Sequence, residues 1–205
     1  MFTTFIIAFF FSFIGSIPPG TLNLSVIQLS LDNKLKAAIR FSLAAAIIEF
    51  PYAFIAVKFE NLITSSPIVL NNFKLIAAVV MISLGTVNLI TYSKPSTSDT
   101  LEKLKQSGFR KGVILSILNP LAIPFWVGVT AYLNHQQWIV LTGNWSITIY
   151  VLGISFGTFS LLALLALLSQ YLGGLFRKKS LIQIIPGIIF LILGLYALLE
   201  YLSIL

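Results

Sequence analysis

Long apolar stretches alternate with short polar gaps along the whole of this chain. The apolar stretches cover residues 2–31, 35–57, 73–92, 109–133, 146–172 and 181–202. A helix needs about 20 apolar residues to cross the hydrocarbon core of a bilayer. The pattern therefore predicts six transmembrane helices in an all-α integral membrane protein.

Two of these six stretches contain residues that interrupt a helix. The first holds Pro18-Pro19-Gly20 and the fourth holds Asn119-Pro120. Proline lacks a backbone donor and glycine permits dihedrals that other residues resist, so we expect helices 1 and 4 to be discontinuous. At a rise of about 1.5 Å per residue, each break falls near the bilayer midplane. Backbone that is not helical survives at that depth only where protein buries it or where it lines a watery cavity.

A polar linker divides the chain into two similar halves. Residues 1–93 and 109–205 each contain three predicted helices, and residues 94–108 connect them. Because three is an odd number, the second half enters the membrane inverted relative to the first. This layout is typical of secondary transporters built from two inverted three-helix repeats. Sequence identity between the halves is weak, so the prediction rests on the layout.

Composition and charge agree with a membrane location. Hydrophobic residues make up 58% of the chain and charged residues 9%, which is too apolar for a soluble domain. The net charge of +7 does not indicate nucleic-acid binding, because eleven of the thirteen Lys and Arg residues lie in the first, third and fifth gaps. Positive gaps face the cytoplasm, which predicts that both termini lie outside. Trp138, Trp145 and Tyr150 are among the aromatic residues expected at the outer interface.

The sequence lacks the cysteine and histidine residues that several kinds of functional site require. The chain has no cysteine, which excludes disulfides, thiolate metal sites and cysteine nucleophiles. A single histidine, His135, has no partners for a catalytic triad or a metal cluster, so we expect neither an enzyme nor a cofactor. The N-terminus lacks a basic region, and we expect it to be a retained membrane segment rather than a cleaved signal peptide.

The two breaks predict a binding site for an anionic group. Thr21 can cap the half-helix after the first break, and Asn119 can cap the second with Pro120 at the first helical position. A helix N-terminus offers N–H donors and a partial positive charge, which suit a carboxylate. The alternative is that the prolines only kink the helices for packing. The candidate substrate-binding residues are Pro18, Pro19, Gly20, Thr21, Asn23, Asn119 and Pro120.

Glu49 is the most informative single residue. It lies well inside the second apolar stretch, where an ionised carboxylate is costly, so it faces a cavity, pairs with another group or is protonated. Such a carboxyl could exchange a proton during transport or hold a substrate ammonium group. The alternative is a neutral acid that hydrogen-bonds to a neighbouring helix.

Other residues within the apolar stretches are expected to serve packing. Interhelical hydrogen bonds are the default interpretation for Asn23, Asn88, Ser155 and Gln183. Small residues on one helix face favour close helix contacts, either within the chain or across a homodimer. These small residues are Gly153, Gly157, Gly187 and Gly194.

The residues around the breaks resemble the signatures of the LysE/RhtB family of LysE-type amino-acid exporters. The resemblance lies in Ile17 to Leu24 and in Phe109-Arg110-Lys111-Gly112, which leads to the second break at Leu118-Asn119-Pro120. The hydropathy profile agrees along the whole length. The resemblance implies export of an amino acid or similar small metabolite across the bacterial cytoplasmic (inner) membrane, driven by the proton gradient.

The chain departs from the family pattern in ways that affect the substrate. The family usually has Pro-Gly-Pro at the first break, where this chain has Pro18-Pro19-Gly20, and it commonly has aspartate where this chain has Glu49. An exporter of divalent cations is the alternative within transport, although it needs more membrane-embedded carboxylates or histidines than Glu49 alone. A lipid-modifying enzyme would need a catalytic constellation that the single His135 does not supply. A scaffold without transport would leave the paired breaks without a purpose.

Overall fold

The computed structural model describes most of the chain as helix. It describes residues 1–17, 20–64, 108–119 and 122–172, together with scattered positions between 75 and 89 and between 188 and 202. Every regular element in this described part is an α-helix. The predicted all-helical fold is confirmed to that extent. The third and sixth predicted spans and the linker lie mostly outside the described residues, so the number of six spans stays a prediction.

The first apolar stretch forms two helices instead of one. Helix α1 (Phe2–Gly15) ends before the prolines, and helix α2 (Thr21–Leu31) begins directly after Gly20. Gly20 has an extended backbone, with φ −119° and ψ −175°, which no helix continues through. The predicted break of helix 1 is confirmed.

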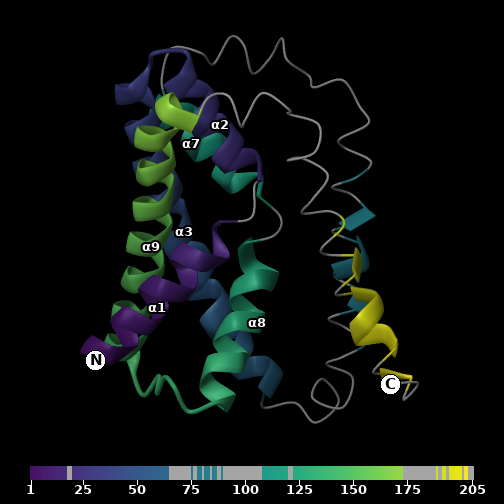
Figure 1. Cartoon of the computed structure of the whole chain (residues 1–205). Coiled ribbons are helices and arrows are strands. Elements are labelled where there is room, and N and C mark those ends of the chain that lie inside the picture. Colours follow the sequence, from purple (N-terminus) through teal and green to yellow (C-terminus); the bar gives the residue numbers. More distant parts are fainter. Residues whose placement is uncertain are drawn as a thin grey trace.

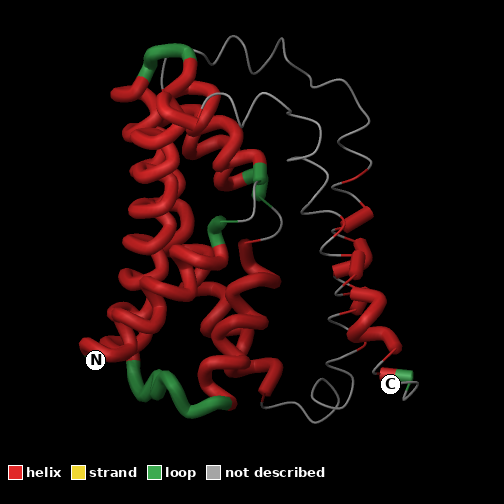
Figure 2. Tube along the Cα trace, in the orientation of Figure 1, coloured by secondary structure: helices red, strands yellow, loops and turns green. Residues whose placement is uncertain are grey.

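The fourth apolar stretch is broken in the same way. Helix α7 (Gly108–Ile117) is followed by helix α8 (Ala122–His135), and their axes are bent by 68°. Figure 2 shows the loops at both breaks near half the height of the molecule. The predicted break of helix 4 is therefore also confirmed.

Two long helices stand beside these broken ones. Helix α3 (Leu35–Thr64) and helix α9 (Asn144–Leu172) are each long and apolar enough to cross a membrane. The bent pair of α7 and α8 forms a third span if it is counted as one, and α1 and α2 are shorter apolar helices. The protein is thus a helical membrane protein with at least two spans in its described part.

The two long helices each hold broken helices from the other half of the chain. Helix α1 packs along α9, whereas α7 and α8 pack along α3, and α3 and α9 also contact each other. Figure 1 shows α1 and α8 at one end of the molecule, and α2 and α7 at the opposite end. The halves are therefore intertwined rather than separate.

Glycines let these helices approach closely. A Cβ atom on Gly153 of α9 would lie 2.6 Å from the Phe5 carbonyl oxygen of α1, and one on Gly157 would meet Phe9 and Ser12. Gly112 of α7 has the same relation to Phe41 of α3, at 2.7 Å. The predicted packing role of Gly153 and Gly157 is confirmed as a contact within the chain, and Gly194 packs against Ile82. Gly187 lies outside the described residues.

The half-helices α2 and α8 end in the same capping motif. Asn33 has φ 59° and Gln137 has φ 58°, so each chain turns through the left-handed region just past the helix. The amide of the next residue then donates back over the last turn, from Lys34 to the Leu29 carbonyl at 2.9 Å and from Trp138 to the Leu133 carbonyl at 3.0 Å. This pattern is the Schellman motif, in which asparagine is the usual substitute for glycine.

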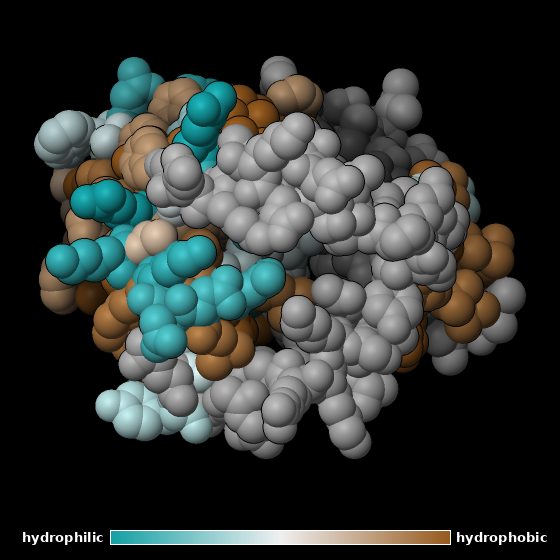
Figure 3. Space-filling view, turned by 90° about the horizontal axis from the view of Figure 1, so that it is seen from above, coloured by the Kyte–Doolittle hydropathy of each residue, from teal (hydrophilic) through white to brown (hydrophobic). Residues whose placement is uncertain are grey.

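Most of the described basic side chains collect at one end of the molecule, and Lys58 lies towards the other end of α3. Lys34, Lys36 and Arg40 lie at the start of α3, and Arg110 lies at the start of α7. Figure 3, which views the molecule from above, shows hydrophilic side chains gathered over this end of the described part. The opposite end, where the chain begins, carries exposed Trp138 and Trp145. Tyr150, which we expected at that interface, is instead fully buried.

Candidate functional site

Glu49 lies at the centre of a contact between α3 and α8. Its side chain is 8% exposed, and its Oε1 accepts a hydrogen bond from the indole Nε1–H of Trp126. Trp126 is 1% exposed and belongs to α8, the helix that follows the second break. A buried carboxyl needs such a partner because apolar surroundings leave it nothing else to bind. The sequence predicted the buried acid correctly but did not identify its donor.

Tyr52 ties the same face of α3 to the other side of the second break. It lies about one turn beyond Glu49, so both side chains project in a similar direction. Its hydroxyl donates to the carbonyl oxygen of Ile117 at 2.7 Å. Ile117 is the last residue of α7, where carbonyls have no partner within the helix. Helix α3 therefore holds α7 with Tyr52 and α8 with Glu49.

An aromatic side chain of α8 connects the first break to Glu49 by direct contacts. Phe125 of α8 lies against Gly15, the last residue of α1, so closely that a Cβ on Gly15 would be 2.5 Å from the ring. The Phe125 ring meets the Trp126 ring edge-on, with centroids 4.9 Å apart. A continuous line of contacts thus runs from the end of α1 through Phe125 and Trp126 to Glu49.

The first break is held together by Asn23 rather than capped by Thr21. Thr21 is the first residue of α2, and the capping position falls on Gly20, which has no side chain to cap with. The predicted cap at Thr21 is therefore wrong. Asn23 Nδ2 instead donates to the carbonyl oxygens of Ser16 at 2.8 Å and Ile17 at 3.4 Å. Space is open around Gly20, where an added Cβ would meet nothing within 4 Å.

At the second break, the Asn119 amide donates to the Ser116 carbonyl at 3.1 Å, which places Asn119 in the turn that ends α7. Helix α8 is described from Ala122, and residues 120 and 121 lie outside the described part, so the cap at Asn119 stays a prediction. Pro18, Pro19 and Pro120 lie outside the described residues.

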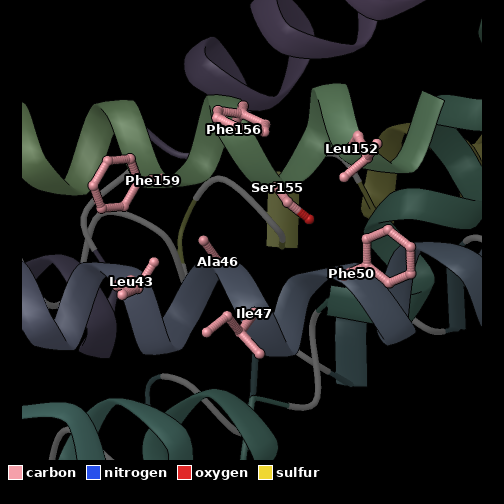
Figure 4. Close-up of a pocket in the computed structure, with 8 residues that line it drawn as sticks. All are labelled: Leu43, Ala46, Ile47, Phe50, Leu152, Ser155, Phe156 and Phe159. Carbon is pink, nitrogen blue, oxygen red and sulfur yellow. The ribbon is translucent and has the colours of Figure 1, made fainter. Parts of the chain in front are cut away.

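A separate cavity of about 400 Å³ lies between α3 and α9 (Figure 4). Its lining is apolar apart from Ser155, and includes Ile47, Phe50 and Phe156. The Ser155 hydroxyl is buried and has no hydrogen-bond partner in the described part of the chain, so its predicted interhelical bond is wrong. With no charged side chain in the lining, this cavity does not suit a charged substrate. Asn88 and Gln183 lie outside the described residues.

The described residues contain no group of three or more acidic or histidine side chains that could hold a metal ion. Glu49 is bonded to an indole, which is not a metal ligand, and the His135 side chain lies outside the described part.

Three functional candidates were missed by sequence reasoning. Trp126 and Tyr52 hold the breaks in place, and Glu60 is a second buried acid, 1% exposed, near the end of α3. A signal was present for Trp126, because an indole N–H in the middle of an apolar span needs an acceptor. Glu60 lies three residues beyond residue 57, where the predicted second span ends, so the search for acids within the spans did not include it.

These features define a class of protein: a multi-pass helical membrane protein with a buried carboxyl that bonds to the half-helix after a break. Comparison with known proteins identifies the family. Residues 13–201 match the model of the LysE type translocator family, so the chain belongs to that family, whose members are transporters and not enzymes. The chain matches no curated protein and no solved structure.

Proposed function

We propose that this translocator exports an amino acid or a similar small zwitterionic metabolite across the bacterial cytoplasmic membrane, coupled to protons. The observation that carries the proposal is Glu49, a buried carboxyl that joins α3 to α8 beside both helix breaks. A carboxyl in such a place is costly and usually marks a substrate or proton site.

Each end of a zwitterion has a candidate partner. The N-terminus of α2, next to the open space at Gly20, suits the substrate carboxylate. Glu49 suits either the substrate ammonium group or the coupling proton. A proton on Glu49 changes the strength of its bond to Trp126, since a charged acceptor binds an N–H donor more strongly than a neutral one. Protonation would therefore loosen the contact between α3 and α8.

Alternating access would come from two inverted halves that move against each other. The proposed halves are residues 1–93 and 109–205, with the linker 94–108 between them. The contacts support this pairing, because α1 on α9 has its counterpart in α7 on α3, and α2 on α9 has its counterpart in α8 on α3. The shared capping motif of α2 and α8 also supports it.

The proposed orientation places the basic end in the cytoplasm and both termini outside. The exposed Lys34, Lys36 and Arg40 support it, because Lys and Arg near span ends are retained on the cytoplasmic side. Under this orientation Glu49 is reached from the cytoplasm through the end that carries α2 and α7.

Efflux from preloaded cells tests the proposal. Cells would be loaded with a mixed pool of labelled amino acids, and native protein compared with Glu49→Gln and with Asp32→Asn. Asp32 is an exposed acid at the end of α2, so its amide variant is the matched control. We expect release of particular amino acids that depends on the pH gradient in the native and Asp32→Asn proteins, and its loss in Glu49→Gln.

Two other results would count against the proposal. If native protein and Glu49→Gln release amino acids equally, Glu49 is structural and does not couple transport. If the native protein releases no amino acid at all, the substrate class is wrong.

A further inference from the structure

Helix α3 carries a second buried acid on the same face as Glu49. Glu60 is 1% exposed and lies about three helical turns, or roughly 16 Å, beyond Glu49. At 3.6 residues per turn the two side chains differ in direction by only about 20°. Both therefore face α8.

Helix α8 carries a row of hydrogen-bonding side chains on the side that faces α3. Trp126, Thr130 and Asn134 recur at every fourth residue, the spacing that lines one helix face. Trp126 donates to Glu49, and Asn134 Nδ2 donates to Glu60 Oε1 at 3.4 Å. Thr130 lies between these two contacts.

A pair of hydroxyl groups, one from α8 and one from α9, lies between the Glu49 contact and the Glu60 contact. The Thr130 hydroxyl lies 3.0 Å from the Tyr150 hydroxyl of α9, and both side chains are fully buried. Thr130 lies one helical turn from Asn134, the residue that donates to Glu60, so the hydroxyl pair lies next to the Glu60 contact. A hydroxyl can accept one proton while it donates another, which an indole or amide N–H cannot do readily.

The described groups near Glu60 come from α8, from α9 and from α3 itself. Helix α8 presents Asn134, which is neutral, and α9 presents Tyr150 beside Thr130. On α3 itself, Lys58 lies over the Phe54 ring at 5.6 Å from its centroid and is exposed. Helices α2 and α7 lie towards the opposite end of the molecule (Figure 1).

We propose that Glu60 is a second proton-exchange carboxyl, which passes protons between Glu49 and the aqueous medium at the end of the molecule where the chain begins. The proposal rests on the proposed function for its purpose, since the protons would drive export. A proton from water binds the Glu60 carboxylate and moves to the Tyr150 hydroxyl, whose own proton moves to Thr130. Thr130 passes its proton through one bridging water to Glu49, and each hydroxyl ends as it began.

Trp126 provides a direct reporter of Glu49. The chain has three tryptophans, so replacing Trp138 and Trp145 by phenylalanine leaves Trp126 as the single fluorophore. Its indole is bonded to Glu49, so its emission changes when Glu49 gains a proton. The experiment is a rapid acidification outside proteoliposomes that contain this single-tryptophan protein, with Glu49→Gln to show that the signal comes from Glu49.

We expect a fast phase in the fluorescence of the single-tryptophan protein. Glu60→Gln should slow this phase by about a hundredfold, the scale expected for loss of a positioned proton-transfer group. Tyr150→Phe, which keeps the buried ring, should slow it as well, whereas Asp32→Asn should leave it unchanged. An equal rate in Glu60→Gln and the parent protein would overturn the proposal. So would a Trp126 signal that does not respond to acidification, since no proton then reaches Glu49.

The fluorescence needs no substrate, which separates this inference from the proposed function. A protein that exports no amino acid but has the Glu60-dependent phase would refute export and keep the relay. If the native protein exports amino acids, and Glu60→Gln changes neither the efflux nor the fluorescence phase, the relay is refuted and export stands.

Discussion

Several buried polar side chains of this protein meet a partner from another helix. Ser12 donates to the Ile154 carbonyl at 2.6 Å, and Ser30 donates to the Ala166 carbonyl. In apolar surroundings, leaving a polar group without a hydrogen-bond partner destabilises the protein by more free energy than one hydrogen bond contributes on balance. The Glu49–Trp126 bond follows the same logic, but it joins an ionisable group to the helix next to a break. It is therefore the contact most able to change during transport.

A double-mutant cycle tests this contact. Glu49→Leu, Trp126→Phe and the double variant would be compared by thermal unfolding in detergent. We expect the two positions to be coupled by about 1–3 kcal/mol, because either single change leaves a buried polar group without its partner. Effects that add to within about 0.5 kcal/mol would show that the bond does not stabilise the protein.

The close contacts of α1 with α9 and of α7 with α3 depend on glycines, which have no side chain. Gly153 and Gly157 form a small-residue face on α9 that admits α1 to backbone distance, and Gly112 does the same for α7 on α3. In a bilayer there is no hydrophobic force between helices, so close packing supplies much of the association energy. The discontinuous helices are held in place by these glycines.

Adding a methyl group on this face should separate α1 from α9. Gly153→Ala places a Cβ atom 2.6 Å from the Phe5 carbonyl, so we expect a lower unfolding temperature from overpacking of about 1–3 kcal/mol. Gly128→Ala is the matched control on α8, because nothing lies within 4 Å of its Cβ position. That variant should be neutral or slightly more stable, since alanine is the better helix former. Equal stability of both variants would contradict the packing role.

The whole molecule is polarised along its long axis. Basic side chains mark one end, and exposed tryptophans mark the other, with the breaks between them. The charge pattern predicts which end faces the cytoplasm, and the proposed site at the broken helices lies between the two ends.

Thiol labelling tests the orientation directly. The chain has no cysteine, so single cysteines can be added without a background. We expect an impermeant thiol reagent to label Gln136→Cys in intact cells, and to label Asp32→Cys only after permeabilisation. Both positions are exposed in loops, which makes them a matched pair. Labelling of Asp32→Cys in intact cells would reverse the orientation.

The sequence by itself determined the helical membrane class, the two breaks and the burial of Glu49, whereas the number of six spans stays a prediction. Each depends on local properties: runs of apolar residues, proline and glycine in the backbone, and a carboxyl placed where water is absent. Tertiary structure alone decided that Trp126 donates to Glu49, that Tyr52 holds the end of α7 and that Glu60 is buried facing α8. Hydropathy states that a residue is inside the membrane but not which helix it meets. That partner follows from how α3, α8 and α9 pack, and these helices are far apart in the chain.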